Sequence, residues 1–287
     1  IFALGPLGLA SRIVRKFASE KDEKTRAVYE ANHPKGTAED NSNRGPLLYD
    51  VAGYIVSRQP ETFIVEEVVG LATGERRPAL DKLIKMLRDV TCRNRRVYHV
   101  EWKEINAEEI GGVPQNRPRP YICGIDRSLA VGGPDNVKFD WPEPIPRPKL
   151  SDFLKPNSAP KWTPSSQTQQ ANLVRLWELA QEETGKNPKS TMFAFDISAS
   201  EQFAKGCMKE RCPAITRSRA SGGGYYLSAR QRMTTAKDLT KLQGFPTNMK
   251  RATATDRQFA TMVGNAMTVP VLSRIQRMVL EAAGYIK

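Results

Sequence analysis

Apolar residues in the first half of the chain recur at two periods, and the two alternate along the sequence. Short apolar or alternating runs predict strands, whereas apolar residues spaced three and four apart predict amphipathic helices. The predicted strands are residues 1–4, 16–20, 63–65, 98–102 and 121–125, and the predicted helices centre on residues 25–29, 48–55 and 80–87. Strands that alternate with helices are typical of a sheet covered on both faces. We therefore expect an α/β fold with a Rossmann-like, doubly wound core over residues 1–141.

The alternation then stops. Seven prolines fall within residues 142–164, which predicts a linker or an extended segment. A helix is expected over Gln169–Glu183 with Gly185 as its stop, and the stretch up to residue 230 combines short strands with glycine-rich turns. We therefore expect residues 142–230 to form a smaller, irregular second domain.

Residues 231–287 again carry clear helix signals. Thr235 is placed to cap a short helix, and Pro270 suits the first turn of a long terminal one. Between these helices Gly264 and Asn265 predict a turn. The small residues at this turn would let the backbone come close to a ligand.

Charge and composition narrow the class of partner. The chain carries a formal net charge of +13, and residues 201–287 hold 15 of its basic residues against 5 acidic ones. Such a basic end suggests a polyanion, most simply nucleic acid, although charge that serves solubility alone is the competing interpretation. No apolar run approaches the roughly 20 residues of a membrane span, so no membrane partner is expected. The chain starts at Ile1 inside a predicted strand, so we expect it to be a fragment, and a signal peptide cannot be judged from it.

Four cysteines are spread without the close pairing typical of zinc sites or disulfide frameworks, namely Cys92, Cys123, Cys207 and Cys212. Both histidines are isolated. We therefore expect no metal site, and a reducing, intracellular location that would be nuclear in a eukaryote and cytoplasmic in a bacterium.

The most informative stretch is GVPQNRPRPYICGI, residues 112–125. Its prolines exclude a helix, and in an extended segment Gln115, Arg117 and Arg119 project to the same side. Two guanidiniums and an amide on one face are suited to a phosphate or the edge of a base. A solvated edge strand would show the same pattern, so other stretches decide between the two interpretations.

Acidic and glycine-rich positions follow other predicted strands. Glu66 and Glu67 end the third strand, where α/β active sites lie, and neighbouring carboxylates raise each other's pKa. Glu20 ends the second strand, a common place for an acid that binds ribose hydroxyls. Gly5, after the first strand, begins a weak form of a glycine-rich cofactor turn. Each of these acids could equally be a solvated residue in a loop.

Taken together, these stretches resemble the cytosine-5 DNA methyltransferase family, in the order in which the family carries them. GVPQNRPR, LTKLQGFP and VGNAMTVPV are similar to three family elements, and FIVEEV stands where the family has Glu-Asn-Val. FASEKD with the later Asn-His-Pro resembles the cofactor-ribose segment, and IFALGPLG is a degraded form of the family's first glycine turn. The variable residues 142–230 then correspond to the target-recognition domain, and residues 231–287 return to the catalytic core.

The resemblance implies methyl transfer from S-adenosylmethionine to carbon 5 of a cytosine flipped out of double-stranded DNA. Glu66 would bind ring nitrogen 3 and the amino group, while Arg119 and Arg117 beside it would hold the carbonyl and orient the nucleophile loop. The cofactor would be held by Phe2, Gly5, Glu20, Asn265 and Ala266, with Glu20 on the ribose.

One departure concerns catalysis directly. The family's nucleophilic cysteine lies in a Pro-Cys loop between the Asn-His-Pro segment and the glutamate, and no Pro-Cys dipeptide occurs in this sequence. The missing block belongs between Pro34 and Arg44. Glu67 also replaces the family's asparagine, which should raise the pKa of Glu66 or disturb its placement. Three hypotheses stay open: an incomplete sequence, an inactive relative that binds DNA or a partner methyltransferase, and an active relative that methylates tRNA.

Overall fold

The computed structural model describes residues 47–93, 95–155, 159–200, 207–246 and 248–286, together with two short strands nearer the N-terminus. These strands, β1 (Ala18–Ser19) and β2 (Ala38–Glu39), pair in parallel. Two residues of the stretch between Pro34 and Arg44 therefore belong to a strand pair. Phe2, Gly5, Glu20 and the Asn-His-Pro segment lie outside the described residues.

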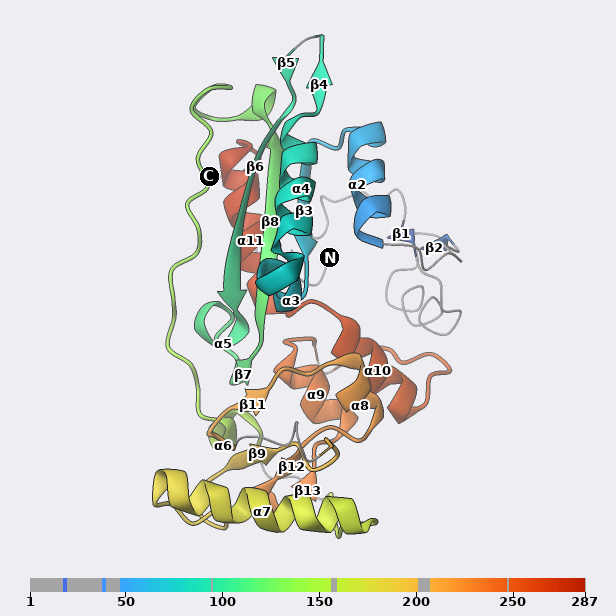
Figure 1. The fold of residues 1–287 in the computed structure, drawn as a ribbon, viewed down its shortest axis with the longest axis vertical. Coiled ribbons are helices and arrows are strands. Elements are labelled where there is room, and N and C mark those ends of the chain that lie inside the picture. The colour runs from blue at the N-terminus through green and yellow to red at the C-terminus, as the bar shows by residue number, and fades with distance from the viewer. Residues whose placement is uncertain are drawn as a thin grey trace.

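A three-stranded sheet forms the centre of the upper part of the molecule (Figure 1). The strands β3 (Thr62–Glu66) and β6 (Tyr98–Asn106) flank β8 (Pro118–Asp126), which is antiparallel to both. β3 and β6 therefore run in the same direction. The strands predicted near residues 63–65, 98–102 and 121–125 are confirmed.

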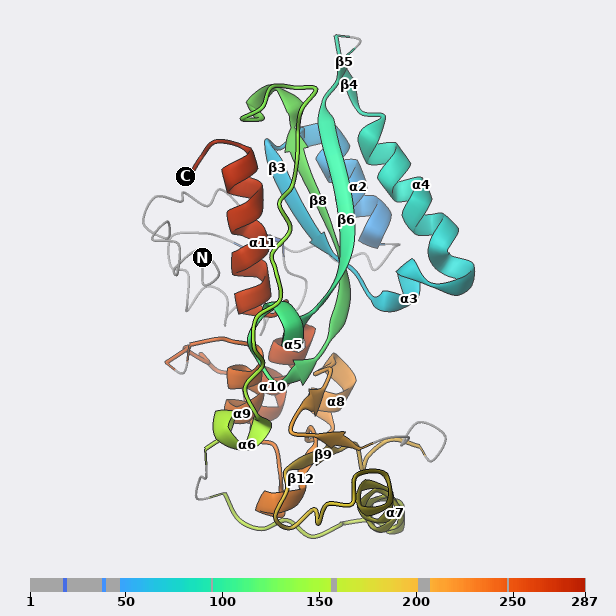
Figure 2. The ribbon, with the colours of Figure 1, turned by 90° about the vertical axis from the view of Figure 1, so that its left-hand side faces the viewer.

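Helices cover both faces of this sheet, as a doubly wound α/β core requires (Figure 2). On one face, α2 (Leu47–Arg58) and α4 (Arg77–Arg88) pack against Phe63 and Tyr98. On the other, α11 (Val269–Ala282) packs against Tyr121, Cys123 and Ile125 of β8. Smaller elements at this end are α3 (Val69–Ala72), η3 (Gly74–Arg76), β4 (Thr91–Cys92), β5 (Arg95–Arg96), α5 (Ala107–Ile110), β7 (Gln115–Asn116) and η4 (Arg127–Leu129).

A long segment, residues 130–149, runs down the α11 side of the sheet from the loop after β8 to the lower part of the molecule (Figure 2). Trp141 Nε1 donates to the Glu101 carboxylate at 3.0 Å, and the Ile145 amide donates to the Glu109 carbonyl at 2.8 Å. Phe139 is buried against the same face. The extended course predicted for residues 142–164 is thus present up to residue 149, where α6 (Leu150–Phe153) interrupts it, and the observed segment begins earlier than predicted.

The lower part of the molecule is built on a four-stranded antiparallel sheet in the order β10-β9-β12-β13. Helix α7 (Gln167–Thr184) covers it, and Gly185 ends the helix with a φ of 61°, as predicted. The elements of this part are β9 (Phe193–Phe195), β10 (Met208–Lys209), β11 (Cys212–Pro213), α8 (Arg217–Ser221), β12 (Tyr226–Leu227), η5 (Ser228–Arg230), β13 (Arg232–Met233), α9 (Ala236–Leu242) and α10 (Asp256–Asn265). Among the described residues, no helix has the length and apolar content needed to cross a membrane.

The predicted short helix capped by Thr235 is present as α9, and Thr235 and Asp238 form a reciprocal capping box. The turn predicted at Gly264 and Asn265 is wrong, because both residues belong to the last turn of α10. A glycine is needed at position 264 because of close packing between helices, and not because a ligand approaches the backbone there. A Cβ atom there would lie 2.6 Å from the carbonyl oxygen of Thr216 and 2.9 Å from the Cβ of Ala220. The glycine lets α10 pack closely on α8.

Replacing Gly264 by alanine should therefore lower the free energy of unfolding by about 1–3 kcal/mol, because the backbone of α8 must move. Urea denaturation monitored by circular dichroism measures this change. Gly53, in the middle of α2, is the matched control, because an added methyl group there would meet no atom within 4 Å. Gly53→Ala should stabilise the protein slightly, since glycine is costly within a helix. Equal effects of the two substitutions would contradict this account of Gly264.

Candidate functional site

Glu66 lies at the carboxyl end of β3, directly opposite Tyr121 of β8. The Tyr121 hydroxyl donates to Oε1 of Glu66 at 3.1 Å, and Nη2 of Arg117 lies 3.7 Å from Oε2. Only 10% of the Glu66 side chain is exposed. Burial, with the charge of Glu66 second, raises the pKa of Tyr121, so its hydroxyl stays a neutral donor. The carboxylate is therefore held between a hydroxyl and a guanidinium.

Arg117 is buried, and its guanidinium donates hydrogen bonds to two backbone carbonyls of the protein. Nη1 donates to the Ile215 carbonyl at 2.6 Å, and Nη2 donates to the Ala266 carbonyl at 3.1 Å. Its Nε is buried without a hydrogen-bond partner among the described residues. Arg117 thus joins the base of β8 to two segments more than ninety residues later in the chain.

Gln115 shares this side of the extended segment, as its alternation with Arg117 predicts. It is fully buried: Nε2 donates to the Leu242 carbonyl and to Oε1 of Gln243, each at 3.1 Å, while Oε1 accepts from the Ile215 amide at 2.9 Å. The prediction that Gln115 offers donors to a ligand is wrong, because its whole amide is used inside the protein.

Arg119 makes fewer hydrogen bonds to the described residues than Gln115 or Arg117 does. Its Nη1 donates to the carbonyl of the neighbouring Pro118 at 2.7 Å, and its side chain is half-buried. Burial, followed by the charge of Arg117, lowers its pKa, and Glu66 opposes this change. Arg119 therefore lies near enough to Glu66 to feel its charge, and among the described residues its Nη2 and Nε have no hydrogen-bond partner that would compete with a ligand.

Gln243, from LTKLQGFP, is a buried residue whose importance the sequence did not reveal. Its Nε2 donates to the carbonyls of Val263 at 3.0 Å and Ala266 at 2.9 Å. Its Oε1 accepts from Thr268 at 2.8 Å and from Gln115 at 3.1 Å. One side chain therefore connects the three motifs that lie around residues 115, 243 and 266. Tyr121 was also missed, although it continues the alternation of Arg117 and Arg119.

Asn265 and Ala266 are the two candidate cofactor residues within the described part of the chain. Asn265 is exposed at the end of α10, and the carbonyl of Ala266 is fixed by Arg117 and Gln243. An exposed amide on a fixed backbone is a suitable donor and acceptor for a polar ligand. These two residues are compatible with part of a cofactor site.

Glu67 adds a second carboxylate next to the site. Burial raises its pKa, a bond from the Val68 amide lowers it, and the charge of Glu66 raises it further. Glu67 has no contact with Arg117 or Tyr121 among the described contacts, and its Oε2 accepts from Val68 at 3.4 Å. The prediction about the pKa of Glu66 itself stays a prediction.

The four cysteines differ in their access to solvent. Cys123 and Cys212 are fully buried, and burial raises the pKa of each thiol. Burial, helped by a bond to Glu183, raises the pKa of Cys207 to about 11, and Cys92 is exposed on β4. A thiolate is needed for nucleophilic attack, so Cys123, Cys207 and Cys212 are poor nucleophiles at neutral pH.

Iodoacetamide at neutral pH should therefore alkylate Cys92 rapidly in the folded chain and the other three thiols slowly. Mass spectrometry of the digested protein locates the modified residue, and the same reaction in denaturant should modify all four. Rapid labelling of Cys123 in the folded protein would show that β8 opens and would overturn its assignment to the core.

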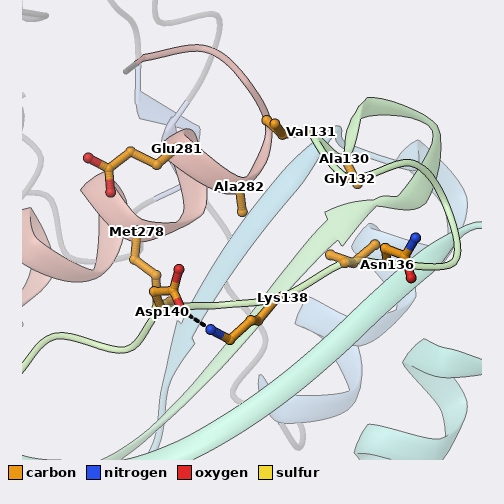
Figure 3. A pocket seen from close by; sticks show the side chains of 10 residues that line it. Ala130, Val131, Gly132, Asn136, Lys138, Asp140, Met278, Glu281 and Ala282 are labelled. Atoms are coloured by element: carbon orange, nitrogen blue, oxygen red, sulfur yellow. Dashed lines mark ion pairs between the residues drawn. The ribbon is translucent and has the colours of Figure 1, made fainter.

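Two cavities lie away from Glu66. One, of about 250 Å³, is formed between the end of α11 and the loop after residue 129, and Met278 extends from the helix toward Asp140 beside it (Figure 3). There the ammonium of Lys138 is paired with Asp140 at 2.6 Å. The other, of about 460 Å³, lies along α4 beside Trp102. No group of three or more histidine, cysteine or acidic side chains suited to a metal occurs within the described ranges.

The fold is that of an α/β methyltransferase. The family profile described as C-5 cytosine-specific DNA methylase matches residues 35–281. The chain belongs to this family, as its sequence motifs predict.

Among characterised proteins, the chain is similar to three type II methyltransferases. It is 37% identical to M.NgoBV of Neisseria gonorrhoeae over 113 residues, which is 39% of this chain and 25% of that protein. It is 24% identical to M1.ScrFI of Lactococcus lactis subsp. cremoris, in an alignment that covers 84% of this chain and 57% of that protein. It is 27% identical to M.HpaII of Haemophilus parainfluenzae, in an alignment that covers 87% of this chain and 68% of that protein. The chain thus spans from a quarter to about two thirds of the length of these relatives.

Solved structures confirm the fold. The Dnmt2 methyltransferase of S. pombe superimposes with a TM-score of 0.56 at 16% identity, covering 98% of this chain and 94% of that one. A Spodoptera frugiperda DNMT2 mutant superimposes with a TM-score of 0.60 at 12% identity, covering 97% of this chain and 95% of that one. The Entamoeba histolytica methyltransferase EhMeth superimposes with a TM-score of 0.58 at 12% identity, covering 92% of this chain and 89% of that one. At these identities the likeness concerns the fold alone.

Proposed function

We propose that this chain forms the base-binding and DNA-binding parts of an enzyme that transfers a methyl group from S-adenosylmethionine to carbon 5 of cytosine in duplex DNA. The observation that carries the proposal is the placement of the Glu66 carboxylate between Tyr121 and Arg117, beside Arg119. The match of the family profile over most of the chain supports the reaction type.

A flipped cytosine presents donors and acceptors that complement this cluster. Glu66 would accept a hydrogen bond from the exocyclic amino group and, in its protonated form, donate one to ring nitrogen 3, while Arg119 would donate to the carbonyl oxygen. Tyr121 and Arg117 hold the carboxylate in place, so its orientation is set before the base arrives. The contribution of these residues is thus to bind the base and to stabilise charge that develops on its ring.

S-adenosylmethionine, when bound, supplies an electrophilic methyl group on a sulfonium sulfur. Asn265 and Ala266 would hold part of it, together with Phe2, Gly5 and Glu20, which lie outside the described residues. The proximity of Ala266 to Arg117 would bring the cofactor to the same side of the sheet as the base.

Duplex DNA is the proposed partner. Residues 201–287 carry most of the excess positive charge, and Arg217 is exposed on α8, two residues after the Ile215 backbone that Gln115 and Arg117 hold. Basic side chains on the lower part of the molecule would contact phosphates on both sides of the flipped base.

The covalent step needs one more group. Addition of a thiolate to carbon 6 makes carbon 5 nucleophilic in this family, and the 287 residues contain no Pro-Cys dipeptide to supply it. We therefore propose that methyl transfer requires a cysteine segment between the Asn-His-Pro stretch and Glu66, and that this chain alone binds and flips cytosine without forming an adduct.

A randomised duplex pool tests the proposal. The chain should enrich a short cytosine-containing sequence, and that selected duplex, with 2-aminopurine next to the cytosine, should brighten when the chain binds because stacking is lost. The same duplex with 5-fluorocytosine should bind without covalent trapping. Enrichment of no cytosine-containing sequence, or binding without a fluorescence change, would contradict the proposed function. Preferential binding of tRNA would point to RNA as the substrate instead.

A further inference from the structure

We infer that Arg117 is a positioning residue that couples the cofactor side of the site to the base side, so that cofactor and DNA strengthen each other's binding. The inference rests on the proposed function, because it names how the two ligands of the same site communicate. It goes beyond that function in assigning the coupling to one buried guanidinium and to the carbonyl of Ala266.

The first support is the position of the guanidinium between the two proposed ligands. Its Nη2 donates to the carbonyl of Ala266 at 3.1 Å and lies 3.7 Å from Oε2 of Glu66. Ala266 directly follows Asn265, the exposed candidate cofactor residue, and Glu66 is the candidate base-binding residue. A single nitrogen atom thus faces a group from each side of the site.

The second support is that the guanidinium has unused bonding capacity although it is buried. Its Nε has no hydrogen-bond partner among the described residues, and 3.7 Å is too long for a hydrogen bond to Glu66. A shift of less than about 1 Å would bring Nη2 into hydrogen-bond range of Glu66. A small movement therefore changes how firmly the carboxylate is held, and charge-assisted bonds are the strong ones.

The third support is that the carbonyl of Ala266 is tied to a rigid surrounding. Gln243 donates to the same oxygen at 2.9 Å, and Gln243 is itself held by the Thr268 hydroxyl at 2.8 Å and by Gln115. Buried, close-packed groups transmit a displacement rather than absorb it. A ligand that orders the backbone at Asn265 would consequently fix Arg117 in one position relative to Glu66.

Thermodynamic linkage makes the consequence measurable, because a coupling free energy acts equally in both directions. Isothermal titration of the full chain with S-adenosylhomocysteine, with and without the selected duplex, gives the coupling factor, and titration of DNA with and without S-adenosylhomocysteine must return the same factor. In the unmodified chain we expect a factor within the usual range of about 5–150.

Arg117→Lys keeps the positive charge but loses the planar fork that spans both carbonyls. It should reduce the coupling factor to near one. The affinity for DNA alone should also fall, because Arg117 lies beside Glu66, but the coupling factor is a ratio and does not depend on that loss. Arg274→Lys is the matched control, because Arg274 also donates to a backbone carbonyl, that of Ile110 at 2.8 Å, at a distance from both proposed ligands. The control should keep the full coupling factor.

If Arg117→Lys does not fold, the coupling factor is measured in Thr268→Val instead. This change removes one anchor of Gln243 at nearly constant volume and leaves Arg117 intact, and it should also lower the coupling factor. An unchanged factor in whichever of these two variants folds overturns the inference, as does a factor of one in the unmodified chain when both ligands bind. Failure of DNA or of S-adenosylhomocysteine to bind at all overturns the proposed function instead.

Discussion

Replacing Gln243 by leucine should lower the free energy of unfolding by about 3–5 kcal/mol, because several buried polar groups lose their partner at once. The Thr268 hydroxyl and the Val263 carbonyl lose bonds of 2.8 and 3.0 Å. The Ala266 carbonyl loses one of its two side-chain donors, and the Gln115 amide loses one of its three bonds. Equilibrium urea denaturation measures the effect. The mutated side chain is of similar size, so lost hydrogen bonds rather than a cavity account for the change.

The control for this experiment is Gln170, an exposed glutamine of α7. Gln170→Leu should change stability by no more than about 0.5 kcal/mol, because surface substitutions away from special features have small effects. A loss of about 1 kcal/mol or less for Gln243→Leu would show that water replaces the missing bonds and that the three motifs hold together without this amide.

Glu66→Gln should weaken binding of the selected duplex by about tenfold to a hundredfold, since hydrogen bonds to a charged group are replaced by weaker neutral ones. The new amide also places its –NH2 donor opposite either the Tyr121 hydroxyl or the Arg117 guanidinium, so one of the two contacts that hold this side chain is lost. Fluorescence of 2-aminopurine next to the cytosine should fall with the affinity, because the base returns to the stack.

Glu67→Gln is the control, since Glu67 is the adjacent acid and has no described contact with Tyr121 or Arg117. Its affinity for the selected duplex should stay near that of the unmodified chain. Equal losses for the two substitutions would mean that net charge, and not the placement of Glu66, determines binding.

Much of the secondary structure could be predicted because its signals are local. Leu80, Leu83, Ile84 and Leu87 of α4 repeat at helical spacing and are all buried, and the alternation around Val100 marks β6. The cap of α9 and the glycine stop of α7 depend on neighbours within a few residues of each other.

The candidate site was only partly predictable because its partners are distant in sequence. Alternation correctly put Gln115 and Arg117 on one side, but no local signal shows that this side faces Ile215 and Leu242 across the molecule. The same limit explains the error at Gly264, where the packing of α8 outweighed the tendency of a glycine to end a helix. The sequence motifs identified the family, whereas the contacts of Gln243 required the structure.

The position of α11 has a consequence for how the protein is made. This helix covers the face of β8 that carries Tyr121, Cys123 and Ile125, yet it is synthesised some 150 residues later. While the ribosome adds the intervening residues, that apolar face has no helix over it. Folding of the upper sheet can therefore be completed only after Val269–Ala282 has been synthesised, and a nascent chain stalled before Val269 should depend on chaperones and be degraded quickly.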